Sequence, residues 1–360
     1  MKTNRLMQMI GCVCVSLILC SCQKKTERSL PIEQKNGAVI TRYDEGYYQM
    51  KGEIYGTYYS IIYGADSVCV ESDKLDSVFA LIDNSLSTFV PTSVISRVNQ
   101  NDSTVKLDEF FVTVFRKGQY ISTVTDGAFD MTVAPLVNCW GFGFKKSDQV
   151  TPQMIDSIKQ YVGYQKVRLE GNKIVKDNPN TMLDASAIAK GFSCDVVANY
   201  LASLQIKNYM VEIGGEIVTA GKNSHGETWN IGITQPTETN GIESPDLQTV
   251  VSLSGVGLAT SGNYRQFYYK DGKRYSHTIN PHTGFPAERN LLSATVIAPD
   301  CMTADAFATS FMVMGLDSAY AFASQQNDLA AYFIYSDDQD QLQVKYTDSF
   351  RQYLKFTENE

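Results

Sequence analysis

The segment over residues 303–314 constrains the fold most, because apolar side chains occupy nearly all of its faces at helical spacing. A surface helix has one apolar stripe, whereas a helix that is apolar all round is buried. Thr303 is the expected N-cap, and Gly315 is expected to end the helix after Met314. The same helix carries Asp305, and a buried carboxylate needs a partner such as a cation. The fold must therefore surround this helix and supply that partner.

The rest of the chain mixes strand and helix patterns. Alternating β-formers predict strands over residues 49–63, and Asp271-Gly272 predicts a hairpin between residues 267–270 and 273–279. Further strands are predicted over residues 210–213, 229–233, 250–253, 294–298, 330–335 and 342–346. Helices are predicted over residues 74–86, 107–124 and 152–161 (capped by Thr151), and from a cap at Asp184 or Ser186 to about residue 204. Strict βαβ alternation is missing, which favours an α+β fold, with β-sheets packed against helices in one domain over residues 46–358.

Composition excludes several classes of protein. The chain has 360 residues, 43% hydrophobic and 19% charged, with a formal net charge of −8. These values exclude a disordered chain, a collagen and a multispanning membrane protein. The acidic balance argues against nucleic-acid binding, which normally uses a basic face.

The N-terminus has the pattern of a secretory signal. Lys2 and Arg5 precede an apolar stretch of about 15 residues, too short to span a bilayer comfortably. Leu19-Cys20-Ser21-Cys22 resembles a bacterial lipobox, in which the last cysteine is lipidated. We expect a lipoprotein signal peptide over residues 1–21, lipidation of Cys22, a tether over residues 22–45, and an envelope protein anchored by lipid and facing the periplasm. The alternative is an ordinary signal peptide with incidental cysteines.

Four cysteines lie beyond this leader, namely Cys69, Cys139, Cys194 and Cys301. They form no CxxC motif and have no histidine at ligand spacing, which argues against a zinc site. They allow three disulfide pairings, although free buried thiols are favoured because Cys139 adjoins Trp140 and Cys194 lies within a helical pattern.

Several segments are richer in glycine and polar residues than a core needs, and each also has a structural interpretation. Gly214-Gly215 suits a tight turn, His277 lies near a Pro-Gly turn, and Lys190 suits an exposed helix position. Gly191 within a helix costs about 1 kcal/mol relative to Ala, which indicates close approach of another group. The GxxxxGK[ST] phosphate loop is absent.

Asp305 and Thr309 form an i, i+4 pair, so both side chains project to one side of the helix. Such a pair of oxygens suits Mg²⁺, which takes few protein ligands and completes its shell with water and phosphate oxygens. The alternative is a solvated helix face, against which the apolar surroundings argue.

Taken in chain order, these segments carry a resemblance. The series comprises residues 52–57 (GEIYGT), 87–89 (STF), 93–99 (SVISRVN), 126–130 (DGAFD), 140–143 (WGFG), 183–191 (LDASAIAKG), 212–216 (EIGGE), 259–265 (ATSGNYR), 277–284 (HTINPHTG) and 304–309 (ADAFAT). It closely resembles the ApbE family of FAD:protein FMN transferases, bacterial envelope proteins that are often lipoproteins. Each motif is weak alone, whereas the ordered set is specific and spans roughly residues 52–315.

The resemblance implies a reaction and a set of residues. Family members cleave FAD with Mg²⁺, join FMN through a phosphoester to a Thr or Ser of a partner protein, and release AMP. The implied metal ligands are the side chains of Asp305 and Thr309 and the carbonyl of Ala187, and His277 matches the general base. The implied FAD-binding residues are Tyr55, Phe89, Ala128, Phe129, Asp130, Asp184, Lys190 and Ile279. The implied acceptor is an envelope electron-transfer subunit.

Some positions depart from the family pattern. Tyr55 stands where Met is common, and Phe89 stands where a Tyr usually contacts the flavin. Further departures are Ala185, Ser186, Asn280 and His282. Two other functions stay open: a Mg²⁺-dependent FAD pyrophosphatase, which releases FMN and AMP, and a lipoprotein that binds FAD without catalysis.

Overall fold

The computed structural model describes residues 31–142, 150–236, 247–263, 267–270, 273–276, 278–287 and 290–355. Its centre is a ten-stranded sheet in which every neighbouring pair is antiparallel. In spatial order the strands are β1 (Pro31–Lys35), β2 (Ala38–Asp44), β3 (Tyr47–Ile54), β4 (Thr57–Gly64), β7 (Tyr209–Ile213), β8 (Glu216–Ala220), β11 (Val256–Gly262), β14 (Leu291–Ala298), β15 (Ala330–Ser336) and β16 (Leu342–Tyr346). Sheet and helices occupy separate layers, which confirms the α+β class.

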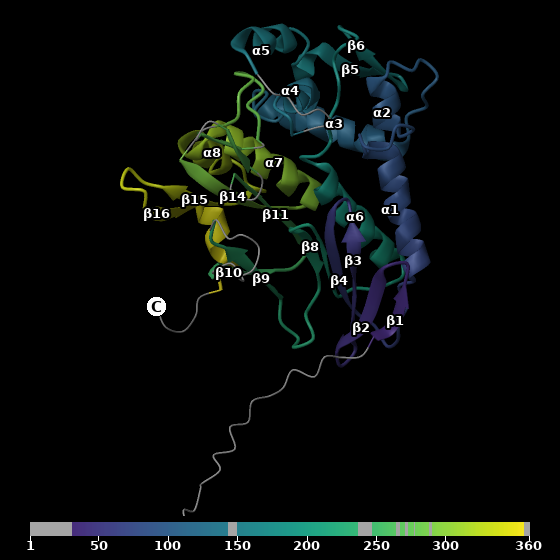
Figure 1. Ribbon diagram of the computed structural model, residues 1–360. Coiled ribbons are helices and arrows are strands. Elements are labelled where there is room, and N and C mark those ends of the chain that lie inside the picture. Colours follow the sequence, from purple (N-terminus) through teal and green to yellow (C-terminus); the bar gives the residue numbers. More distant parts are fainter. Residues whose placement is uncertain are drawn as a thin grey trace, which may run out of the picture.

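Helices cover one face of this sheet. They are α1 (Ser72–Leu86), α3 (Glu109–Val124), α6 (Ala189–Ser203), α7 (Cys301–Met314) and α8 (Leu316–Ala323). Figure 1 shows α6 and α7 side by side, with α1 beyond α6 and α8 beyond α7. Because α7 lies between sheet and helices, nearly every one of its residues is buried, as its apolar faces predict.

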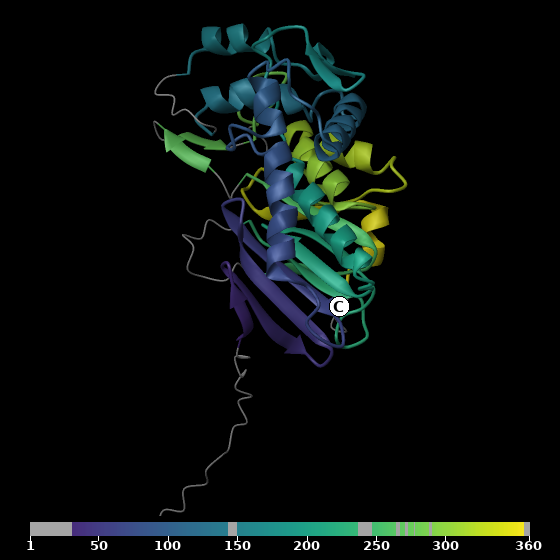
Figure 2. The ribbon, with the colours of Figure 1, turned by 90° about the vertical axis from the view of Figure 1, so that its right-hand side faces the viewer.

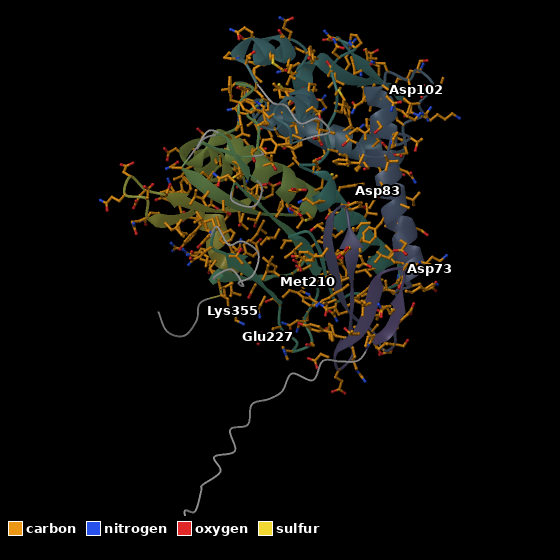
Figure 3. The ribbon with its side chains drawn as sticks, viewed as in Figure 1. Asp73, Asp83, Asp102, Met210, Glu227 and Lys355 are labelled. Carbon is orange, nitrogen blue, oxygen red and sulfur yellow. The ribbon has the colours of Figure 1, made fainter. Side chains whose placement is uncertain are left out.

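A second apolar cluster covers the opposite face of the sheet. It joins Ile217, Leu258 and Ile297 of the sheet to the hairpin of β9 (Trp229–Thr234) and β10 (Leu247–Leu253). The C-terminal segment closes this side, because Lys355 donates its backbone N–H to Val250 and its ammonium lies 3.7 Å from Glu227 (Figure 3).

A smaller part lies beyond the helical layer, at the top of Figure 1. It contains α2 (Val94–Asn99), α4 (Ala134–Cys139), α5 (Pro152–Lys159), β5 (Val167–Glu170) and β6 (Lys173–Lys176). Its own apolar cluster includes Leu136, Trp140, Ile155 and Ile279. The hairpin of β12 (Phe267–Lys270) and β13 (Lys273–Ser276) projects from the molecule on the left of Figure 2. Its two strands confirm the predicted hairpin, although β13 ends at Ser276 and the turn residues Asp271 and Gly272 lie outside the described residues.

The tether expected over residues 22–45 is wrong from residue 31 onward. Strands β1 and β2 occupy this stretch and form one edge of the main sheet, where β2 pairs with β3. Ala38 and Ile40 point into the main core, because alternate residues of a strand face one side. The signal peptide and Cys22 lie outside the described residues. Among the residues that are described, none belongs to a helix of the length and apolarity needed to span a bilayer.

Two helix starts differ from the prediction. Helix α7 is capped by Asp300, which accepts the Thr303 N–H at 2.7 Å, while the Thr303 hydroxyl is bonded to Lys117. Helix α6 begins only at Ala189, because the Asp184 carboxylate caps a preceding turn through the Ser186 amide.

Other predicted boundaries hold. Thr151 caps α5 through the Met154 amide, and Gly315 ends α7 with a φ of 79°. The other predicted strands are present within one or two residues, except that β10 and β14 each begin three residues earlier than predicted. The four cysteines beyond the leader are free; Cys194 and Cys301 are buried as expected, whereas Cys69 is exposed.

Candidate active site

Three charged side chains meet where α6, α7 and the start of β8 come together. The Lys190 ammonium of α6 lies 2.5 Å from Glu216 Oε1, and the Glu216 side chain is only 4% exposed. Asp305 of α7 is 3% exposed and interacts electrostatically with both residues. The cluster holds two carboxylates and one ammonium in a mostly buried place.

Gly191 lets α6 approach α7 closely enough to form this cluster. A Cβ at this position would lie 2.3 Å from the Cys301 carbonyl oxygen and 2.8 Å from Asp305 Cβ. The Gly191 N–H donates to Asp305 Oδ2 at 3.0 Å. The close approach that a helical glycine indicates is therefore made by the backbone of α7.

The same hydrogen bond leaves a carbonyl free at the start of α6. In a regular helix the Gly191 N–H would donate to Ala187, four residues earlier. Because it donates to Asp305 instead, the Ala187 carbonyl receives no backbone hydrogen bond from any described residue. A carbonyl that receives no hydrogen bond from the described residues is a suitable oxygen ligand for a cation.

Thr309 adds a third oxygen to this side of α7. It lies one turn after Asp305, and its hydroxyl is 3.1 Å from Ser261 Oγ on β11. The carboxylate, hydroxyl and carbonyl oxygens of Asp305, Thr309 and Ala187 form the donor set that a hard divalent cation prefers. The residues implied by the resemblance therefore fit Mg²⁺, as judged from the chemistry of the donors.

The charge of the cluster also fits a cation. Burial raises the pKa of Asp305. Burial and the nearby Asp305 raise the pKa of Glu216 to about 7. Burial lowers the pKa of Lys190, but Asp305 and Glu216 raise it more, so the ammonium stays charged. The raised pKa values mean that negative charge on these two carboxylates is disfavoured in this buried place, and a bound cation would stabilise it.

The glycine pair between β7 and β8 brings a third motif to the cluster. Gly214 has a φ of 62°, and a Cβ there would lie 2.9 Å from Thr57 Cγ2 and 3.5 Å from Lys190 Cδ. The pair thus makes the tight turn that its sequence predicts. Gly214 therefore lies close both to Thr57, the residue after the β3–β4 turn, and to the Lys190 side chain.

Phe129 and Asp130, two of the residues expected to bind flavin, make contacts within the protein. Phe129 is buried in the main core. The Asp130 carboxylate accepts hydrogen bonds from the amide and hydroxyl of Thr132 and from the Tyr164 amide. Burial raises the pKa of Asp130, and these hydrogen bonds lower it. Both side chains therefore hold the fold together.

This segment nevertheless lies beside other candidate residues. A Cβ on Gly127 would be 3.3 Å from His282 Cε1, and the Met131 carbonyl accepts the Asp184 N–H at 2.7 Å. Ile279 is buried with Trp140, whose indole donates to the Gly284 carbonyl at 2.8 Å. Ala128, Asp184 and Ile279 thus belong to neighbouring segments of the smaller part beyond the helical layer, which we call the outer layer. His277 lies outside the described residues.

The two aromatic candidates, Tyr55 and Phe89, differ in exposure. Tyr55 has a φ of 55° in the β3–β4 turn and packs edge-on against Phe79, with ring centroids 6.0 Å apart. Phe89, after the end of α1, is 72% exposed. Phe89 is therefore the more accessible of the two surfaces for stacking.

Glu216 of the cluster and Ser261, which contacts Thr309, were not predicted individually. Glu216 follows the glycine pair and faces the helices, because it pairs with the inward-facing Ile213. A charged residue at an inward position of a strand was the available signal. Ser261 belongs to a glycine-containing motif, but its contact with Thr309 depends on tertiary packing.

Fold and site together define an α+β protein with a buried oxygen-rich cluster, and comparison with known proteins identifies its family. The family model described as "ApbE family" matches residues 55–333. A Haemophilus influenzae protein named FAD:protein FMN transferase is 36% identical over 349 residues, covering 93% of this chain and 94% of its own. A Vibrio cholerae protein of the same name is 35% identical over 94% of this chain and 93% of its own.

Solved structures agree. The flavin transferase ApbE from Vibrio cholerae has a TM-score of 0.77 and 36% identity, covering 86% of this chain and 99% of its own. The Pseudomonas stutzeri flavinyl transferase ApbE in its apo form has a TM-score of 0.75 and 29% identity, covering 85% and 96%. The chain belongs to the ApbE family.

Proposed function

We propose that this chain is an FAD:protein FMN transferase. It cleaves FAD at the pyrophosphate, joins the FMN phosphate to a Thr or Ser hydroxyl of a partner protein, and releases AMP. The names of relatives that match it over nearly their whole length support this proposal. The single observation in the molecule that carries it is the placement of oxygen ligands at the cluster: Asp305 and Thr309 lie one turn apart on α7, and the Ala187 carbonyl receives no backbone hydrogen bond from a described residue.

Asp305, Thr309 and the Ala187 carbonyl would hold Mg²⁺. When bound, the ion supplies positive charge that stabilises the negative charge on the phosphates during cleavage. Lys190 supplies a second, fixed positive charge from α6, and its partly exposed side chain can approach a phosphate. Burial of the surrounding side chains strengthens these interactions by keeping water out.

His277 is the proposed general base, which takes the proton from the acceptor hydroxyl. A hydroxyl is a poor nucleophile at neutral pH, and a positioned imidazole contributes about 10²–10⁴ in rate. His277→Ala should leave FAD affinity near the wild-type value and lower turnover. An unchanged transfer rate in this variant would exclude the role.

The FAD-binding region would combine the exposed Phe89 with the outer-layer segment around Ala128, Asp184 and Ile279. Asp184 links this segment to the cluster at Lys190, because its backbone N–H is bonded to Met131 and it lies six residues before Lys190. Such an arrangement would place the flavin in the outer layer and the pyrophosphate over the cluster.

One incubation separates transfer from the two alternatives. The protein is mixed with FAD, Mg²⁺ and a candidate acceptor protein, and the products are resolved on a denaturing gel and by chromatography. A fluorescent acceptor band with AMP indicates transfer, and free FMN with AMP and no band indicates a pyrophosphatase. Intact FAD after hours would indicate a protein that only binds flavin. The acceptor without its Thr or Ser is the matched control.

The lipobox pattern supports a lipid anchor at Cys22 and a place on the periplasmic side of the bacterial envelope. The partner would then be an envelope electron-transfer subunit. Cys22→Ala should release the protein from the membrane fraction or leave it unprocessed. Absence of lipid on the wild-type protein, measured by mass spectrometry, would exclude the anchor.

A further inference from the structure

Lys190 lies between two buried carboxylates but is bonded to one of them. Its ammonium contacts Glu216 Oε1 at 2.5 Å, whereas its interaction with Asp305 is electrostatic, without a direct hydrogen bond. Asp305 Oδ2 is taken by the Gly191 N–H. The other Asp305 oxygen has no hydrogen bond to a described residue, so we take it as the oxygen available to a ligand.

Glu216 is built to hold that ammonium. Its side chain is buried, and its second oxygen, Oε2, has no hydrogen-bond partner among the described residues. An unpaired buried oxygen is costly, so its retention calls for a role. A carboxylate with a spare oxygen can keep the ammonium of Lys190 on either atom while charge enters the neighbouring site.

We propose that Glu216 is a positioning residue, which draws the Lys190 ammonium away from Asp305 so that Asp305 can bind a divalent cation. This inference rests on the metal site of the proposed function. Without Glu216, the ammonium would pair with Asp305 and compete with the incoming cation. Opposite charges attract strongly where burial lowers the dielectric constant, so the ammonium would compete effectively for Asp305.

Glu216 acts through Lys190 and is not itself a ligand of the cation. Its Oε1 is occupied by the ammonium. In this proposal the cation site uses Asp305 as its one carboxylate and depends on Glu216 to keep that carboxylate free.

The test is a Mn²⁺ titration of the full-length chain without FAD. Binding is measured by calorimetry and by the paramagnetic resonance signal of Mn²⁺. Mn²⁺ takes the same oxygen ligands as Mg²⁺. Glu216→Gln should raise the Kd at least about tenfold, because the ammonium now competes for Asp305. The double variant Glu216→Gln/Lys190→Met should return the Kd to within about threefold of wild type, because the competitor is gone.

Glu212→Gln is the matched control. Glu212 lies in the same β-hairpin but faces the opposite side of the sheet, where it accepts a hydrogen bond from Tyr58 at 2.7 Å. The Glu212→Gln substitution removes one negative charge, as Glu216→Gln does, but leaves the partner of Lys190 in place. The Kd for Mn²⁺ should therefore stay at the wild-type value. Thermal unfolding without divalent ions verifies that each variant folds. If Glu216→Gln does not fold, Glu216→Asp takes its place, since it keeps the charge and withdraws the carboxylate from Lys190.

Two results would overturn the inference. A wild-type Kd in Glu216→Gln would show that Lys190 does not compete. A double variant as weak as Glu216→Gln would show that Glu216 itself binds the ion. Failure of the underlying metal site has a different signature, since Asp305→Asn would then bind Mn²⁺ as the wild type does. Failure of the proposed transfer reaction is recognised separately, by the gel.

Discussion

Asp195 of α6 accepts the backbone N–H of Cys301, the first residue of α7, at 2.9 Å. It also accepts the next amide, that of Met302, at 2.8 Å. One helix thus caps the other, in addition to the cap by Asp300. Lys190 and Asp305 each lie about one turn from this junction, so it fixes the two sides of the cluster relative to each other.

Asp195 should make stability depend on pH. Burial raises the pKa of Asp195 to about 7 from its ordinary 3.8, against the two amide hydrogen bonds, which lower it. Between these values the folded protein holds a proton that the unfolded chain has released. The free energy of unfolding therefore falls as pH rises across this range. In Asp195→Asn the slope should be smaller by up to about 1.4 kcal/mol per pH unit.

Urea denaturation of the metal-free protein at several pH values measures this slope. Asp300→Asn is the control, because it alters the other cap of α7 at a side chain that is 37% exposed. It should lower stability and flatten the pH dependence much less than Asp195→Asn does, because burial raises the pKa of Asp195 more than the charge of Asp300 does. Equal slopes in wild type and Asp195→Asn would mean that Asp195 titrates as it does in the unfolded chain.

Gly191→Ala should destabilise the protein although alanine is the better helix former. The added Cβ would meet the backbone of Cys301, which cannot rotate away, so α6 and α7 must separate. We expect a loss of about 1–3 kcal/mol, which exceeds the gain of about 1 kcal/mol in helix propensity. Gly118→Ala in α3 is the control, since its nearest neighbour is the flexible end of Met131. A Gly191→Ala variant as stable as Gly118→Ala would contradict the close packing.

Asp305→Asn should separate catalysis from folding. The amide oxygen can still accept the Gly191 N–H, but the charge that attracts a cation is lost. Mg²⁺-dependent AMP release should fall at least about a hundredfold, with only partial rescue by more Mg²⁺. The midpoint of thermal unfolding in EDTA should rise, because one of two carboxylates sharing Lys190 becomes neutral. Wild-type release at millimolar Mg²⁺ would show that the ion is held elsewhere.

The sequence allowed prediction of those features that depend on local pattern. The buried helix α7 could be predicted because apolar residues occupy nearly all of its faces, and β3, β4, β7, β14, β15 and β16 of the main sheet because they are rich in β-forming residues. The sheet strands β1, β2, β8 and β11 were not predicted; β1 gives no signal, since all five of its residues are exposed and carry no alternation. The cap of α7 was misplaced because Asp300 and Thr303 both suit an N-cap, and Lys117, far away in sequence, takes the Thr303 hydroxyl.

The candidate site shows the same division. The types of residue and their order pointed to Asp305, Thr309 and Lys190. The role of Glu216 depends on which carboxylate the ammonium chooses, a tertiary contact that spacing does not encode. The orientation of Phe129 and Asp130 was also inaccessible, because a motif identifies a segment without saying which of its atoms face a ligand.

Asp130 offers the clearest separation of a structural role from a binding role. Its carboxylate serves three donors, from Thr132 and Tyr164, and thereby ties the 128–130 segment to the turn after α5. Asp130→Ala leaves these donors without an acceptor. The free energy of unfolding should fall by up to about 1–3 kcal/mol for each donor. We therefore expect a lower midpoint of urea denaturation without FAD, with any loss of FAD affinity following from local unfolding. Asp130→Asn, which keeps an acceptor oxygen, should recover part of both. An Asp130→Ala variant that keeps wild-type stability but has lost FAD affinity would support a direct contact with flavin and contradict the structural role.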